Sequence, residues 1–177
     1  MKKLLLLLLF CLSLFSYDLE LQNGFVAAHT QMLMDSTIDP MTTHLQAQVH
    51  MEDTEFTSIR GKLWVELEFF SSDNHDRDEH MYEVEEIEKF PLASYEITSV
   101  TKDKDNIHYN LHGTLSFHGS QQPLIMRAQI TQENRQITIS ATSQINVTDF
   151  NMQMPCMLFM CVRDEVDIFA KAVFLKP

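Results

Sequence analysis

The chain has 177 residues, with 13 Lys and Arg against 25 Asp and Glu, and a formal net charge of -12 at pH 7. This length is typical of one domain and allows a sizeable core. Nucleic acids and anionic membrane surfaces attract proteins through clustered Lys and Arg, and the sequence has no such cluster. The sequence therefore argues against both classes of partner.

Residues 1–16 have the features of a secretory signal peptide. Two lysines precede the apolar run Leu4–Phe15, and Ser16 offers a small residue for cleavage. This run is shorter than the roughly 20 apolar residues that cross a bilayer. We expect cleavage after Ser16, export to the periplasm, and a mature domain of residues 17–177 without stable membrane insertion. The alternatives are a lipid-modified Cys11 and an uncleaved membrane anchor.

Most of the mature chain alternates between apolar and polar residues, which is the pattern of a β-strand with one buried face. In chain order the predicted strands are Phe25–Met34, Leu45–Met51, Leu63–Phe69, a strand that begins at Tyr95, Ile107–Phe117, Leu124–Ile130, Ile137–Ala141 and Val166–Phe174. The turn residues Gly119–Pro123 join two of them in a hairpin. About eight strands with short connections predict an antiparallel barrel or sandwich. We favour the barrel, whose interior is either filled by side chains or open to one small ligand.

One segment departs from this pattern and predicts a helix. Asp76–Phe90 contains neither Gly nor Pro, and an apolar residue recurs at every third position from Met81 to Ile87. Asp73 or Asn74 can cap the start of this helix, and Pro91 ends it. The strands are therefore interrupted once, by a helix of about four turns.

The inward-facing residues of the strands are the candidate ligand-binding residues of a hollow barrel. They are Leu63, Val65, Leu67, Phe69, Tyr95, Ile97, Leu111, Leu115, Phe117, Leu124, Met126, Ile137, Ile139 and Ile168. Alternation does not distinguish a hollow barrel from a filled one. A packed core is the alternative.

Cys156 and Cys161 are the two cysteines of the mature chain, and a disulfide would survive in an exported protein. If the residues between them were extended, their Cα atoms would lie roughly 16 Å apart, and a disulfide needs about 4.4 to 6.8 Å. The bond therefore requires a turn, and a disulfide and two free thiols both stay open. The C-x₄-C spacing differs from the C-x-x-C redox motif.

His108, His112 and His118 share one predicted strand, but the sequence does not predict a metal site. His108 and His112 would lie roughly 13 Å apart along a strand, beyond the reach of one zinc ion. Only a partner from another strand would complete a site, so we interpret them as solvated histidines. The charged run Arg77–His80 fits the start of a helix, where acids are stabilised by the helix dipole. No nucleophile elbow, zinc-protease helix or phosphate loop is present.

Several motifs occur in a recognisable order. Arg77–Met81 has the sequence RDEHM, Phe90 precedes Pro91, and His112–Gly119 is followed shortly by Pro123. This ordered set of motifs resembles the signatures of the YceI-like family. Members of this family are exported lipocalin-like barrels associated with polyisoprenoid binding. Later segments are also similar, so that the resemblance extends over about residues 58–175; these segments are Val147–Phe150 and Val162–Val166.

The resemblance implies an eight-stranded antiparallel lipocalin-like β-barrel, mainly β, with one α-helix inserted between strands and packed near one end. It implies a lumen that takes a long apolar tail, and a homodimer would be consistent with it. Together with the apolar faces, it predicts a periplasmic binding or carrier protein for a polyisoprenoid-like amphiphile, without cofactor or catalysis. The alternative is a structural barrel with a packed interior that binds a protein partner. A thiol enzyme using Cys156 and Cys161 is a third hypothesis.

Overall fold

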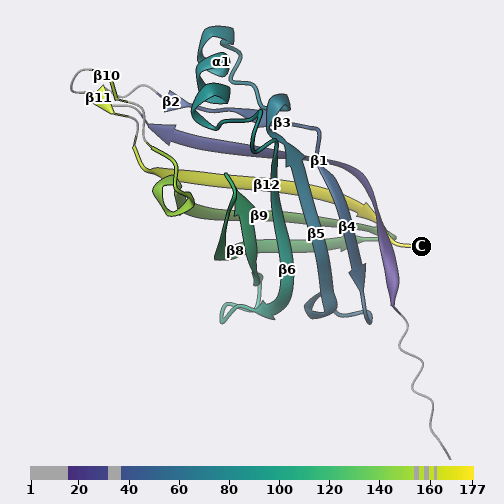
Figure 1. The fold of residues 1–177 in the computed structure, drawn as a ribbon. Helices are drawn as coiled ribbons and strands as arrows, with labels where there is room; N and C mark the ends of the chain where they lie inside the picture. The colour runs from purple at the N-terminus through teal and green to yellow at the C-terminus, as the bar shows by residue number, and fades with distance from the viewer. Residues whose placement is uncertain (1–15, 32–36, 154–155, 158–159, 162) are drawn as a thin grey trace, which may run out of the picture.

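The structure is a computed structural model that describes residues 16–31, 37–153, 156–157, 160–161 and 163–177. Eight antiparallel strands follow the order β12-β9-β8-β7-β6-β5-β4-β1, and β1 also pairs with β12, which closes the barrel (Figure 1). The strands are β1 Tyr17–Gln31, β4 Gln46–Met51, β5 Ile59–Glu66, β6 Leu92–Lys102, β7 His108–Phe117, β8 Ser120–Glu133, β9 Gln136–Asn146 and β12 Glu165–Leu175. The predicted barrel with one inserted helix is confirmed.

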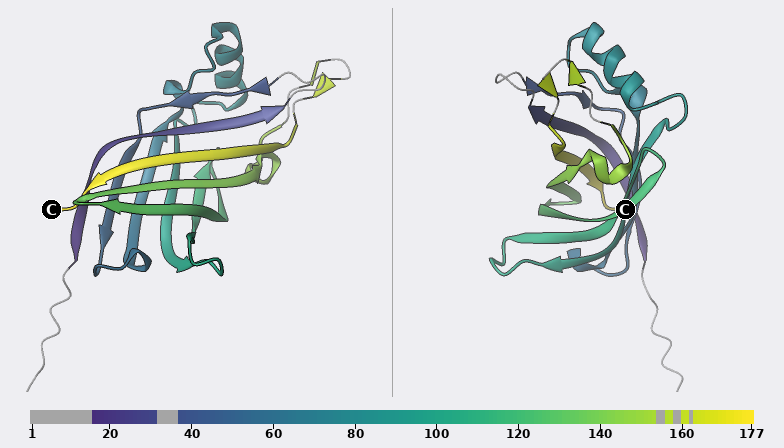
Figure 2. Two further views of the ribbon diagram at one scale, coloured as in Figure 1. Left: turned by 180° about the vertical axis from the view of Figure 1, so that it is seen from behind. Right: turned by 60° about the vertical axis from the view of Figure 1, so that its left-hand side comes forward.

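Shorter elements lie at the ends of these strands. The short strands are β2 Thr37–Ile38 and β3 Met41–Thr42, which pair with β1, and β10 Cys156–Met157, which pairs with β11 Met160–Cys161. The 3-10 helices are η1 Phe56–Ser58, η2 Leu67–Phe69 and η3 Val147–Phe150. The helix α1 spans His75–Val84 and stands at one end of the barrel, as both views of Figure 2 show.

The first strand is longer than the sequence predicted. It begins at Tyr17 instead of Phe25, and the predicted end at residues 32–34 lies outside the described residues. Its register against β12 shifts between Leu21 and Asn23, and successive parts of β1 pair with β4, β3 and β2. A strand with an irregular register and several partners does not keep one buried face, so its alternation is weak.

The predicted hairpin forms with a tighter turn than expected. Phe117 pairs directly with Ser120, and the two residues between them, His118 and Gly119, have φ values of 47° and 71°. Positive φ at both central positions is the conformation of a type I′ hairpin. Pro123 therefore belongs to β8, where it is tolerated because pairing with β9 begins only at Arg127.

Helix α1 begins where predicted and ends earlier. The Asn74 side chain accepts a hydrogen bond from the backbone N–H of Arg77 at 3.1 Å, which is an N-cap. The helix ends at Val84 because Glu86 adopts a left-handed conformation with φ of 47°, and a turn leads on to Phe90. The predicted helical span Asp76–Phe90 was therefore too long, although its apolar residues do pack against the core.

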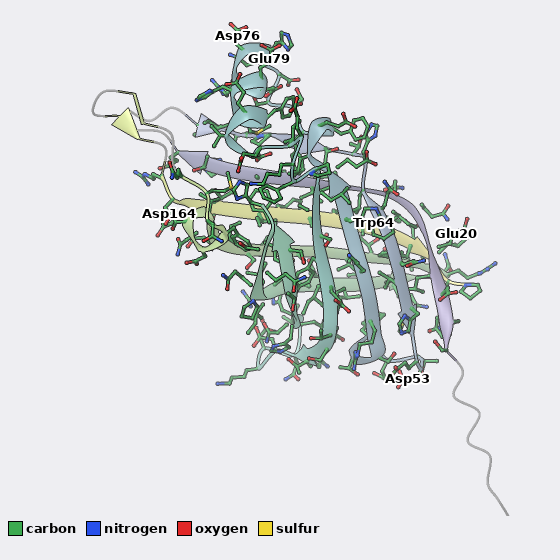
Figure 3. All side chains as sticks on the ribbon, viewed as in Figure 1. Glu20, Asp53, Trp64, Asp76, Glu79 and Asp164 are labelled. Carbon is green, nitrogen blue, oxygen red and sulfur yellow. The ribbon has the colours of Figure 1, made fainter. Side chains whose placement is uncertain are left out.

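The end of the barrel away from α1 is closed by packed side chains. Met51, Ile59 and Ile137 are completely buried and belong to strand ends far from α1. The ring of Phe56 in η1 packs edge-on against Tyr109, with 5.8 Å between centroids. Figure 3 shows the two ends of the barrel, with Asp76 and Glu79 of α1 at one end and Asp53 at the other.

Cys156 and Cys161 belong to the two short strands β10 and β11. The backbones of Cys156 and Cys161 are direct partners in the β10–β11 pair. Residues directly opposite in antiparallel strands have Cα atoms about 4.5 or 5.5 Å apart, which a disulfide can span. The antiparallel pairing of β10 and β11 provides the reversal of chain direction that a disulfide between the two cysteines requires. The disulfide itself stays a prediction.

Candidate functional site

The barrel encloses an apolar cavity of about 200 Å³. Twelve of the predicted residues line it, namely Leu63, Val65, Leu67, Tyr95, Ile97, Leu111, Leu115, Phe117, Leu124, Met126, Ile139 and Ile168. Their role in binding stays a prediction. The alternative of a packed interior predicted no accessible cavity, and the structure holds one.

Two predicted residues lie outside the cavity, each for a physical reason. Strand β5 ends at Glu66, and the 3-10 turn η2 rotates Phe69 outward, where it is 40% exposed and stacks on His44 with 4.0 Å between ring centroids. Ile137 does point inward, but it belongs to the packed end of the barrel. Alternation predicts the face of a residue and not its depth.

The cavity also has lining residues that were not among the candidates. Val26 in β1, Leu45 directly before β4 and Val49 in β4 are three of them, and small residues such as Ala170 leave space between larger neighbours. The alternation of apolar and polar residues could have identified these lining residues in every strand except the first. Segments outside the strands supply a further group, for which alternation carries no information: Phe70, Met81, Glu85, Val147 and Met152.

The Tyr95 side chain forms part of the cavity wall, and hydrogen bonds fix its orientation. Its hydroxyl donates to the carbonyl oxygens of Leu111 at 2.7 Å and Leu124 at 3.0 Å. A Cβ atom on Gly113 would lie 2.6 Å from Tyr95 Cζ, so the glycine leaves the space that the ring occupies. Burial raises the pKa of Tyr95 above its usual range, and the hydroxyl stays neutral. Tyr95 is thus a rigid part of the wall.

Glu85, the C-cap of α1, is the one charged residue among the described residues that line the cavity. Although part of the residue is exposed, its Oε2 is withdrawn from solvent and has no hydrogen-bond partner. Burial raises the pKa of Glu85 to about 7. A carboxyl group in this state is partly protonated near neutral pH.

A set of buried polar contacts holds α1 and its following turn on the barrel. Asp78 accepts hydrogen bonds from the hydroxyls of Ser71 at 2.7 Å and Ser72 at 2.6 Å. Burial opposes ionisation of Asp78, but these hydrogen bonds lower its pKa. His118 Nδ1 donates to the carbonyl oxygen of Phe150 at 3.0 Å, and its Nε2 lies 3.0 Å from Glu86 Oε2. His118 thus joins three segments at the end near α1.

The histidines differ from one another in the structure. The prediction of solvated histidines is wrong for His118, which is 8% exposed, because the tight β7–β8 turn directs it beneath η3. The Nε2 atom of His112 lies 2.9 Å from Thr101 Oγ1, within hydrogen-bond distance. Among the described residues, no group of three or more His, Cys, Asp or Glu is placed to hold a metal ion.

The comparisons with known proteins agree with this geometry. The model of the YceI-like domain matches residues 17–174. The chain belongs to the YceI-like family. The match includes residues 17–57, where no family motif was recognised in the sequence. No protein of curated function matches the chain significantly.

Solved structures of low sequence identity share the YceI-like fold. BcnA from Burkholderia cenocepacia has a TM-score of 0.74 at 15% identity, over 85% of this chain and 95% of its own. A polyisoprenoid binding domain from Saccharophagus degradans has a TM-score of 0.67 at 11% identity, over 90% and 98%. The YceI protein of Campylobacter jejuni has a TM-score of 0.69 at 16% identity, over 82% and 88%. In the described part of this chain, no helix has the length and apolar character to span a membrane.

Proposed function

We propose that this YceI-like protein is an exported binding or carrier protein for an amphiphile with a long apolar, polyisoprenoid-like tail. The observation that carries the proposal is the cavity, which is apolar along the strands and ends at α1. The polyisoprenoid binding domain of Saccharophagus degradans, a structural neighbour, supports this ligand class. No catalytic step is part of the proposal.

The tail supplies the binding free energy in this proposal. Each CH₂ group that moves from water into the lumen contributes about 0.8 kcal/mol, or roughly fourfold in affinity. The lining needs few polar contacts to bind such a tail, and the closed far end of the barrel limits its length. Sequestration in the lumen protects the tail from water, which is what a carrier requires.

Export is part of the same proposal. The expected signal peptide falls mostly on residues 1–15, which lie outside the described residues. Strand β1 begins at Tyr17, directly after the expected cleavage site, so cleavage there would leave every described strand intact. A periplasmic carrier is therefore consistent with the position of the barrel in the chain.

A series of ligands with one head group and increasing tail length tests the lumen as the binding site. We expect affinity to rise roughly fourfold for each added CH₂ and then to level off when the lumen is full. Displacement of a fluorescent long-chain probe measures these affinities. Ala170→Trp narrows the cavity, so the affinity of this variant should level off at a shorter tail length. Affinity that rises without a plateau, equally in both proteins, would place binding on the outer surface instead.

A further inference from the structure

Glu85 is unexpected in this cavity. The other lining residues of the described chain are uncharged, and the only other titratable one, Tyr95, has its hydroxyl committed to two backbone carbonyls. A buried carboxyl oxygen without a partner is unfavourable, because no hydrogen bond replaces the water that the oxygen has lost. A protein that binds only a hydrocarbon has no use for an unpaired carboxyl oxygen in its cavity. The free hydrogen-bonding capacity therefore points to a polar atom that the ligand supplies.

The position of Glu85 indicates which part of the ligand it meets. It follows the last turn of α1, at the end of the cavity opposite the packed residues Met51, Ile59 and Ile137. A long tail inserted toward the packed end leaves its head group at the α1 end. The head group and Glu85 then share one small region of the site.

The charges around Glu85 restrict the kind of head group. Residues 73–89 contain eight acidic residues against Arg77 and Lys89, and Lys89 Nζ is paired with Glu86 Oε1 at 3.8 Å. The pKa of Tyr82 on α1 is raised, chiefly by burial, and its hydroxyl donates to the carbonyl oxygens of Glu68 and Phe70. His118 from the β7–β8 turn is paired with Glu86. Glu68 in η2 and Asp149 in η3 are exposed acids. This environment repels a phosphate or carboxylate head group.

We propose that protonated Glu85 donates a hydrogen bond to the oxygen of a neutral alcohol or carbonyl head group whose tail fills the cavity. The inference rests on the proposed function and adds the class of head group and a pH dependence. A bound ligand covers Glu85 further and favours its neutral form. Uptake is therefore strongest below about pH 7, where Glu85 carries its proton, and weakens as the pH rises and the group ionises.

Three probes with the same geranylgeranyl tail test this inference: the alcohol, the phosphate monoester and the amine. Each is titrated into the exported protein at pH 6 and at pH 8. With a pKa of about 7 for Glu85, we expect the alcohol to bind about tenfold more tightly at pH 6. The phosphate should bind more weakly than the alcohol at both pH values. In Glu85→Gln, which keeps a donor without titrating, the alcohol should bind equally well at pH 6 and pH 8.

Glu88→Gln is the matched control, because it removes one negative charge from an exposed residue of the same segment. It should keep the tenfold pH dependence. The inference is overturned if the wild-type protein binds the alcohol equally at both pH values, or if the amine binds best and more tightly at pH 8. Absence of binding of all three probes at both pH values would overturn the proposed function itself. Thermal unfolding of each variant reports whether the substituted chain is folded.

Discussion

Leu115→Arg is expected to weaken binding of a long-tailed ligand by at least about 100-fold. Leu115 is 8% exposed and lines the cavity two residues before the end of β7. A guanidinium group at this position occupies the space of the tail, and among the described residues only Glu85 brings a charge to the cavity lining. An unpaired charge in such surroundings costs several kcal/mol, and about 2.7 kcal/mol already corresponds to 100-fold in affinity. Probe displacement at constant pH measures the effect.

Ile125→Arg is the control for this experiment. Ile125 lies on the neighbouring strand β8 and is 56% exposed, so the same side chain is added outside the barrel. This variant should bind as the wild-type protein does. If Leu115→Arg does not fold, Ala170→Trp fills the same lumen without a charge and should also weaken binding of the longest tails. Full uptake by a folded Leu115→Arg protein would exclude the lumen as the site.

Gly113→Ala is expected to destabilise the barrel by about 3 kcal/mol. A Cβ atom at this position would lie 2.2 Å from the carbonyl oxygen of Glu96 and 2.6 Å from Tyr95 Cζ. The backbone oxygen belongs to the β6–β7 ladder, and the Tyr95 ring is held by its two hydrogen bonds. Neither neighbour can move without loss of buried contacts. Urea unfolding should show a lower midpoint with a similar slope.

Thr114→Ala, one residue further along the same strand, provides the comparison for this prediction. It removes atoms and adds none, so its cost should stay near or below 1 kcal/mol. The close approach of Tyr95 to the backbone of Gly113 would be contradicted if both variants unfolded at the midpoint of the wild-type protein. A loss of stability confined to Gly113→Ala would support the rigid cavity wall.

The barrel could be predicted from the sequence because most of its strands have one buried face. Along Leu111–Phe117 every residue pairs with β8, and the period of two is preserved although the register of β6 shifts between Ile97 and Ser99. Twelve of the predicted residues consequently line the cavity. The first strand was harder to delimit because a register shift and several partners disrupt its alternation.

The parts of the site that escaped prediction come from segments without strand periodicity. Phe69 was placed in the lumen because its number continues the alternation of β5, and only the η2 turn rotates it outward. Glu85 had the appearance of one exposed acid among many. Its burial depends on where α1 ends and on how the turn after it packs, which no local pattern specifies. His118 owes its burial to η3, which lies about thirty residues further along the chain.

Mass spectrometry of bound organic molecules tests most directly our proposal that the lumen holds a long-tailed lipid. The protein is purified without detergent from its native cells, extracted with organic solvent, and compared with the Leu115→Arg variant. We expect a stoichiometric isoprenoid or other long-tailed lipid with a neutral oxygen-bearing head group in the wild-type extract and none in the variant. A clean wild-type extract, repeated after the protein is offered a lipid mixture, would contradict the claim.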